Sequence, residues 1–342
     1  MKLYNYREKV ILRKLSEDSR ASISDLAKIA KCSRVTASKT LRALKNRYEI
    51  KFGLEVNEDE LGLIQRHLII AKLIKKPKLD DLKEIFKNDL YADNIYLCKG
   101  DFDLIIHTVN SDPMKYIVWE SLLPSKLGEY GLRIYPSELM NTNFGYFPIT
   151  SKQIDIFAKK IDKTDKQLLM LLADNSNMSM SDLSRSLKIS RNTLYYRLFM
   201  LRKNGIIKRF TISVNKPMFD YILAYAVNYH FNTTSSIRSV KMMGYYKGYD
   251  EQLPILNTFQ ILAPMSGSYR FFGIGLFDNE SDAKKNAIKA HKNIFNQEKV
   301  EIKYARIIGI VKGSYPFRNI DINLNYTRFK WNEEGLNNIY PK

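Results

Sequence analysis

The sequence predicts an α+β protein built from two copies of one unit, each a helix-turn-helix followed by a βαββαβ segment. First, residues 24–41, SDLAKIAKCSRVTASKTL, recur as residues 181–198, SDLSRSLKISRNTLYYRL, at a constant offset. Second, strand-like and helix-like patterns follow each copy in the same order. Third, 342 residues are enough for several domains, and a hydrophobic content of 45% is enough for packed cores.

The second copy marks its helices clearly. The expected N-caps are Asp162 or Thr164 for the first helix, Ser179 or Ser181 for the second, and Ser190 for the third. Leu194, Leu198 and Leu201 are spaced i, i+4, i+7 and share the inner face of the third helix. Gly205 follows, as expected just past a helix end. The alternating residues 206–214, IIKRFTISV, are expected to form a wing strand.

The first copy follows the same plan, with Ser33 as the expected N-cap of its third helix. The residues expected on the inner faces are Val10, Ile11 and Leu15, then Ile23, Leu26 and Ile29, then Ala37, Leu41 and Leu44. The inner leucines of the two third helices match, and the outer residues differ. The outer residues are Val35, Ser38, Lys39, Arg42 and Asn46 in copy one, and Asn192, Tyr195, Tyr196, Phe199 and Lys203 in copy two.

A three-helix unit with a basic third helix is typical of DNA-binding domains, in which that helix enters the major groove. The alternatives are a small bundle with a charged solvent face and a winged helix that contacts proteins. We predict two headpieces that bind double-stranded DNA and recognise different sequences. The predicted DNA-binding residues are Arg34, Thr36, Ser38, Lys39, Arg42, Lys45, Arg47, Arg191, Asn192, Thr193, Tyr195, Tyr196, Arg202, Lys203, Lys208 and Arg209.

These residues are expected to divide between bases and phosphates. Arg42 is suited to a guanine edge and Asn192 to an adenine edge. The residues predicted to contact phosphate are Arg34, Lys45, Arg47, Arg191, Arg202, Lys208 and Arg209.

The formal net charge of +19, from 55 Lys+Arg against 36 Asp+Glu, favours a polyanionic partner, most often nucleic acid. An anionic membrane surface is the alternative, although no apolar run is long enough to span a bilayer. Cys32 and Cys98 are too few and too far apart for a disulfide framework, and the first residues lack a signal-peptide pattern. We therefore expect a cytoplasmic protein without a membrane partner.

The segments that follow the headpieces have the order βαββαβ, which is the ferredoxin-like pattern. The expected boundaries are 1–60 for the first headpiece, 64–140 for the first ferredoxin-like domain, 141–160 for a linker, 161–216 for the second headpiece, 219–312 for the second ferredoxin-like domain, and 313–342 for a C-terminal extension.

This order of domains resembles the Lrp/AsnC, or feast/famine, family of transcription regulators. Residues 163–215 resemble that family's winged helix-turn-helix headpiece, and residues 98–112, CKGDFDLIIHTVNSD, resemble the hairpin of its effector (RAM-type) domain. The resemblance implies effector domains that pair with one another and bind small ligands, often amino acids, near the glycine hairpin. Carried over to this chain, it implies effector binding at Gly100, Asp101 and Asp103. The alternative is a plain tight turn.

The second hairpin has Arg270 where the first has Asp103, so it is not expected to bind the same ligand. Pairing of the two effector domains within one chain would form an internal pseudo-dimer, and a homodimer of two chains stays open. The diverged helices would then favour an asymmetric DNA site over a palindrome.

Enzymatic chemistry finds little support in the sequence. The four histidines are scattered, and no metal-ligand spacing, phosphate loop or nucleophile motif is present. Siroheme decarboxylases share the resembling architecture and would use His and Arg around a tetrapyrrole, an arrangement not visible here. We expect no enzyme activity, no cofactor and no metal. A siroheme-decarboxylase-like enzyme and a nucleoid-organising protein with little sequence preference are the alternatives.

Overall fold

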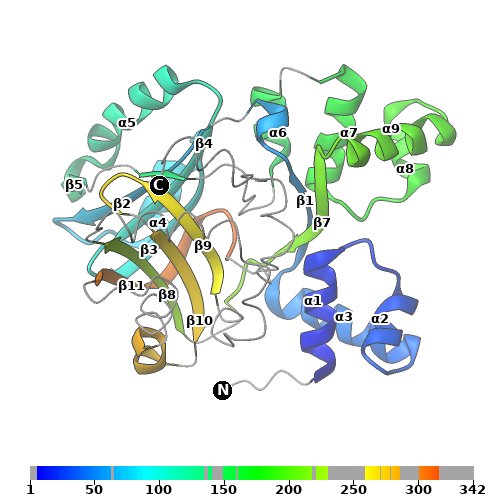
Figure 1. Ribbon diagram of the computed structural model, residues 1–342, viewed down its shortest axis with the longest axis horizontal. Helices are drawn as coiled ribbons and strands as arrows, with labels where there is room; N and C mark the ends of the chain where they lie inside the picture. Colours follow the sequence, from blue (N-terminus) through cyan, green and yellow to red (C-terminus); the bar gives the residue numbers. More distant parts are fainter. Residues whose placement is uncertain are drawn as a thin grey trace, which may run out of the picture.

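The structure is a computed structural model, shown in Figure 1. It describes residues 6–62, 65–134, 138–140, 149–158, 161–217, 221–229, 259–269, 271–277, 279–285 and 300–315. Two helical headpieces lie on one side of the molecule, and a large sheet with its covering helices lies on the other (Figure 1). The predicted α+β class is therefore observed.

The first headpiece consists of α1 (Tyr6–Glu17), α2 (Ile23–Ile29) and α3 (Arg34–Tyr48). Ser33 is the N-cap of α3, as predicted, because its hydroxyl accepts a hydrogen bond of 3.1 Å from the Thr36 N–H. Ile11, Leu26 and Leu44 are fully buried between the three helices. The helical spacing of apolar residues therefore identified the core of this headpiece.

The second headpiece consists of α7 (Lys163–Asp174), α8 (Met180–Leu187) and α9 (Arg191–Lys203). Of the alternatives that the sequence left open, Asp162 caps α7 and Ser179 caps α8, and Ser190 caps α9. Gly205 follows the end of α9 with a φ of 69°, a left-handed conformation that glycine adopts without strain.

The strands that follow the headpieces pair with each other. The expected wing, β7 (Ile207–Ser213), is antiparallel to β1 (Lys51–Val56) of the first half, with Gly53 opposite Thr211 and Leu54 opposite Phe210. The predicted strand is therefore present, and its partner comes from the other half of the chain. Each strand alone would expose unpaired backbone groups, and pairing across the halves satisfies them. Gly53 corresponds to Phe210 in the repeat and Leu54 to Thr211, so an approximate two-fold axis passes between these pairs.

The first ferredoxin-like domain, called the first effector domain after the family resemblance, has the predicted order βαββαβ with its last strand in two parts. It contains β2 (Gln65–Leu73), α4 (Leu79–Phe86), β3 (Ala92–Gly100), β4 (Leu104–Asn110), α5 (Pro113–Leu127), β5 (Leu132–Ile134) and β6 (Glu138–Met140). Short 3-10 turns span Asp59–Leu61 and Gly128–Tyr130.

The described part of the second effector domain contains β8 (Tyr221–Tyr229), β9 (Phe259–Ser266), β10 (Phe271–Phe277), a helical segment at 280–285 and β11 (Val300–Lys312). Residues 230–258, Arg270 and residues 316–342, which are most of the predicted C-terminal extension, lie outside the described residues.

The strands of both halves form one closed sheet. Its order is β4-β3-β11-β8-β10-β9-β6-β2-β5, and an additional pairing of β4 with β2 closes the ring. Strands β11 and β6 join the halves, since β11 pairs with β3 and β6 pairs with β9. One buried core draws residues from both halves, among them Tyr96, Phe102, Phe272 and Ile274. The two effector domains are therefore one packed body within a single chain.

Part of the segment expected to be a linker is helical. Residues 151–157 form α6 (Ser151–Phe157), whose N-terminus is closed by a capping box between Thr150 and Gln153. Ile154 and Ala158 are buried in the core of the second headpiece. The part of this segment that the structure describes is thus packed rather than extended. Among the described residues, no helix combines the length and apolar character needed to cross a membrane.

Candidate nucleic-acid interface

The outer face of α3 is basic. Lys39 and Arg42 are exposed, and no ion pair joins either of them to an acidic side chain among the described residues. Thr36 and Ser38 lie beside them, partly buried. An Arg guanidinium in this position has the donor geometry to recognise a guanine edge if the helix enters a major groove.

The outer face of α9 is aromatic. Tyr195, Tyr196 and Phe199 expose 59%, 64% and 59% of their surface. Asn192 and Thr193 are exposed in the first turn, and the Lys203 ammonium lies 6.0 Å from the centre of the Phe199 ring. The inner residues Leu194 and Leu201 are buried, as predicted. The helix therefore carries aliphatic side chains on its buried face and aromatic side chains on its exposed face.

The residues predicted to contact phosphate differ in exposure and in their hydrogen-bond partners. Arg34, Lys45, Arg191 and Arg202 are exposed, although Arg191 donates a hydrogen bond of 2.7 Å to the Ser181 hydroxyl. Arg47 is exposed and bonds Glu8 at 3.1 Å. These side chains lie at the surface of the headpieces, where a phosphate backbone would be reached.

Arg209 does not fit its predicted role. Its guanidinium is 2.6 Å from the Glu55 carboxylate, and the two side chains expose only 11% and 4% of their surface. The two residues face each other in the β1–β7 ribbon, so the pair joins the two halves of the chain. Lys208 beside it is partly buried and has contacts of its own. The prediction of a phosphate contact for Arg209 conflicts with this placement.

Two further contacts fix the headpieces relative to each other. The Ser19 and Ser176 hydroxyls are 2.7 Å apart. Arg20 donates hydrogen bonds to the backbone carbonyls of Ser176 and Met178 at 2.8 and 3.1 Å, and its guanidinium lies 5.2 Å from the centre of the Phe210 ring. Arg20 is not among the residues predicted from the sequence. Its counterpart in the repeat is Asn177, and this difference between the copies is the sequence signal that could have marked it.

The predicted effector residues are engaged in structural contacts. A Cβ at Gly100 would lie 2.4 Å from the Tyr304 carbonyl, so the approach of β11 requires glycine there. Asp101 bonds the Tyr304 N–H at 2.7 Å. The Asp103 carboxylate is buried, accepts the Leu73 N–H at 3.0 Å and lies 3.3 Å from the Lys72 ammonium. The Lys72 ammonium thus stands where an effector ammonium was expected.

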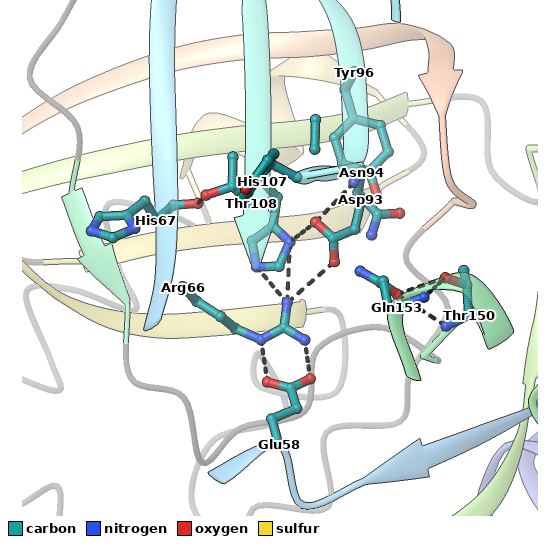
Figure 2. A network of polar contacts seen from close by, with 12 residues as sticks. Glu58, Arg66, His67, Asp93, Asn94, Tyr96, His107, Thr108, Thr150 and Gln153 are labelled. Carbon is teal, nitrogen blue, oxygen red and sulfur yellow. Dashed lines mark hydrogen bonds and ion pairs between the residues drawn. The ribbon is translucent and has the colours of Figure 1, made fainter. Parts of the chain in front are cut away.

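A buried polar network occupies one end of the first effector domain (Figure 2). Arg66 forms two hydrogen bonds with Glu58, and its guanidinium also lies 3.3 Å from Asp93 and 3.0 Å from His107 Nε2. His107 Nδ1 is 2.6 Å from Asp93. Burial lowers the pKa of His107 more than Asp93 raises it. The neutral ring can then donate from Nδ1 to Asp93 and accept at Nε2 from Arg66. These polar groups satisfy one another.

No group of three or more His, Cys, Asp or Glu side chains is arranged to hold a metal ion in the part of the chain that the structure describes. The exposed cationic and aromatic side chains of α3 and α9, with the basic residues around them, form the candidate site.

Comparison with known proteins agrees with this location for the second headpiece, which contains α9. A family model described as winged helix-turn-helix DNA-binding matches residues 161–208. An uncharacterized HTH-type transcriptional regulator of Pyrococcus furiosus is 43% identical over 58 residues, which are 17% of this chain and 39% of that protein. One of Pyrococcus horikoshii is 42% identical over 55 residues, 16% of this chain and 37% of the relative. The chain thus spans about two fifths of the length of these relatives.

Solved structures extend the likeness to the whole chain. The siroheme decarboxylase NirDL has a TM-score of 0.55 at 12% identity, covering 96% of this chain and 99% of that one. At this identity the likeness shows the fold alone, a tandem arrangement of two helix-turn-helix and sheet units. The leucine response regulatory protein of Mycobacterium tuberculosis has a TM-score of 0.34 at 17% identity, over 40% of this chain and 91% of its own.

Proposed function

We propose that the protein is a sequence-specific, DNA-binding transcription regulator whose two headpieces bind different half-sites. One observation carries the proposal. Two helix-turn-helix units are held together across one β-ribbon, and each has an exposed third helix that carries cationic side chains without an acidic partner among the described residues. Lys39 and Arg42 are such residues on α3, and Arg202 and Lys203 on α9. The net charge of +19 favours the same partner.

The first test is the salt dependence of binding to duplex DNA. Each phosphate contact releases counterions, so the logarithm of affinity should fall linearly with the logarithm of salt concentration. The variant Arg34→Ala should reduce the slope by about 0.9 and weaken binding to all sequences alike. Arg13→Ala is the matched control, since Arg13 is an exposed residue of α1 that pairs with Glu17. Absence of binding to genomic fragments at low salt would exclude the proposal that the protein is a transcription regulator.

The second test is selection of preferred sites from a randomised duplex library. An asymmetric site is expected, with half-sites separated by about 10–10.5 base pairs or a multiple of this spacing. The variants Arg42→Ala and Asn192→Ala should each relax the preference at particular bases, by about 1–3 kcal/mol. A single enriched palindrome would instead mean that equivalent headpieces from two chains bind together. Binding without any enrichment would favour a nucleoid-organising protein.

Regulation by a small effector is part of the proposal and is assigned to Gly100, Asp101 and Asp103. An effector with an ammonium group would have to displace Lys72 from Asp103, where the two charged groups are 3.3 Å apart. A panel of amino acids scored by thermal shift tests this, because a ligand that binds only the folded chain raises its melting temperature. A shift that persists unchanged in Asp103→Asn would locate the effector elsewhere.

A tetrapyrrole decarboxylase is the second candidate, favoured by the likeness to NirDL along the whole chain. The buried Arg66 and His107 give it little support, because both are engaged with Glu58 and Asp93. We propose that the chain is not an enzyme. Incubation of the protein with siroheme, followed by mass analysis of the tetrapyrrole, tests this. Loss of carbon dioxide from the tetrapyrrole would overturn the proposal.

A further inference from the structure

The aromatic face of α9 is the feature that the proposed function leaves unexplained. Tyr195, Tyr196 and Phe199 are each more than half exposed, on a helix whose inner face already packs into the headpiece core. Exposed aromatic rings grouped on one surface typically mark a site that is covered by a partner. The three positions follow the Ser190 N-cap closely, in the part of the third helix that approaches base edges in helix-turn-helix proteins.

The repeat offers a direct comparison at these positions. At an offset of 157 residues, Tyr196 corresponds to Lys39 and Phe199 to Arg42. The inner face is apolar in both copies, with Leu201 and Leu44 both buried. The outer face changes in kind, from long cations on α3 to aromatic rings on α9. The two helices therefore present different chemistry to the same kind of partner.

The charge around the aromatic face points to DNA as that partner. Helix α9 carries four cationic side chains and no acidic one, in the sequence RNTLYYRLFMLRK. Lys203 lies over the Phe199 ring, and Arg191 and Arg202 are exposed near the two ends of the helix. A rim of cations around an apolar centre matches the major groove of a duplex, where phosphates flank the base edges.

We propose that α9 recognises the 5-methyl groups of thymine through Tyr196 and Phe199, whereas α3 recognises guanine through Lys39 and Arg42. The thymine methyl group is the apolar feature of the major groove, and side chains such as Phe contact it. Guanine offers two acceptors that suit Lys or Arg. The inference rests on the proposed function and specifies its DNA: an asymmetric site with one thymine-rich half and one guanine-containing half.

Deoxyuridine substitution tests the proposal, because it removes only the methyl group of thymine and keeps the base pair. The full-length protein is first used to select a site from a randomised library. Thymines in that site are then replaced one at a time. Loss of one buried methyl contact should weaken binding about fourfold. Phe199→Ala and Tyr196→Ala should bind the thymine and deoxyuridine duplexes equally. Arg42→Ala is the matched control and should keep the discrimination.

The outcomes separate this inference from the proposed function. If no duplex is bound at low salt, the proposed function fails and the inference fails with it. If the wild-type protein binds the selected site but does not distinguish thymine from deoxyuridine, the inference alone is overturned. Equal weakening on both duplexes by Phe199→Ala would also overturn it, because the ring would then contact the DNA without recognising the methyl group. The exposed positions allow these changes without unfolding, which thermal denaturation of each variant checks.

Discussion

The hydroxyl oxygens of Ser19 and Ser176 lie 2.7 Å apart and are buried, although 157 residues separate them in the chain. That separation equals the offset of the internal repeat, so each serine hydrogen-bonds to its own counterpart. An approximate two-fold axis between the two copies brings equivalent residues together in this way. The β1–β7 pairing places the same axis between Gly53–Leu54 and Phe210–Thr211. The two headpieces therefore meet as the subunits of a symmetric dimer do.

The serine pair should be energetically coupled. Ser19→Ala or Ser176→Ala alone leaves a buried hydroxyl without its partner, and each should lower the free energy of unfolding by about 1–3 kcal/mol. The double variant should cost less than the sum, because it leaves no unpaired hydroxyl. Urea denaturation of the four proteins in this cycle measures the coupling. Additive effects would mean that the hydroxyls do not interact.

Arg20 should determine the spacing of the two headpieces on DNA. Its guanidinium belongs to the first headpiece and bonds two backbone carbonyls of the second, those of Ser176 and Met178. In Arg20→Ala we expect tolerance of longer and shorter spacers between half-sites, with preferences inside each half-site unchanged. Binding to a set of duplexes with varied spacers measures this. Arg13→Ala should behave as the wild type, and unchanged spacer tolerance in Arg20→Ala would contradict the assignment.

The Arg209–Glu55 pair should matter for stability and not for DNA. Arg209→Ala removes a cationic partner from the buried Glu55 carboxylate, so it should lower the free energy of unfolding by about 3–5 kcal/mol. A hydrophobic pair, Arg209→Met with Glu55→Leu, should recover most of this loss. Chemical denaturation measures both. The slope of the logarithm of DNA affinity against the logarithm of salt concentration should be the same in the folded double variant as in the wild type. A slope smaller by about one would show that Arg209 contacts a phosphate.

His67 should make the protein less stable as the pH falls below neutrality. Burial, with the nearby His107, lowers the pKa of His67 to about 4. The unfolded chain, with a pKa near 6.5, then binds more protons than the folded chain between these values. The stabilisation is therefore complete above about pH 6.5 and is lost as the pH falls toward 4, by at most about 1.4 kcal/mol per pH unit. Partial exposure to solvent reduces this slope.

The variant His67→Phe isolates this effect. The His67 ring stacks on Tyr116 with centroids 3.7 Å apart, and phenylalanine preserves an aromatic contact without a titrating group. Urea denaturation between pH 4 and pH 7 should show a smaller loss of stability for the variant than for the wild type. Parallel curves for the two proteins would mean that His67 does not titrate in this range.

The sequence by itself determined the helices of the two headpieces, the order of elements in the first effector domain and the two faces of each third helix. Ser33 and Ser190 were recognisable as N-caps because capping acts within one helical turn. Leu44 and Leu201 were recognisable as core residues because the helical period places them on one face. The basic face of α3 and the aromatic face of α9 follow from the same period. These properties depend on neighbours within a few residues, so they can be derived without knowing the fold.

Only the tertiary structure decided how the two copies join. The partner of β7 is β1, the partner of Arg209 is Glu55, and Lys72 takes the place beside Asp103 that was expected for a ligand. Arg66 and His107, 41 residues apart, meet in one buried network (Figure 2). An isolated strand or charged side chain can be satisfied by many partners, and its sequence does not distinguish among them. The packing of distant segments determines the partner, because a polar group that is buried without a hydrogen bond destabilises the fold.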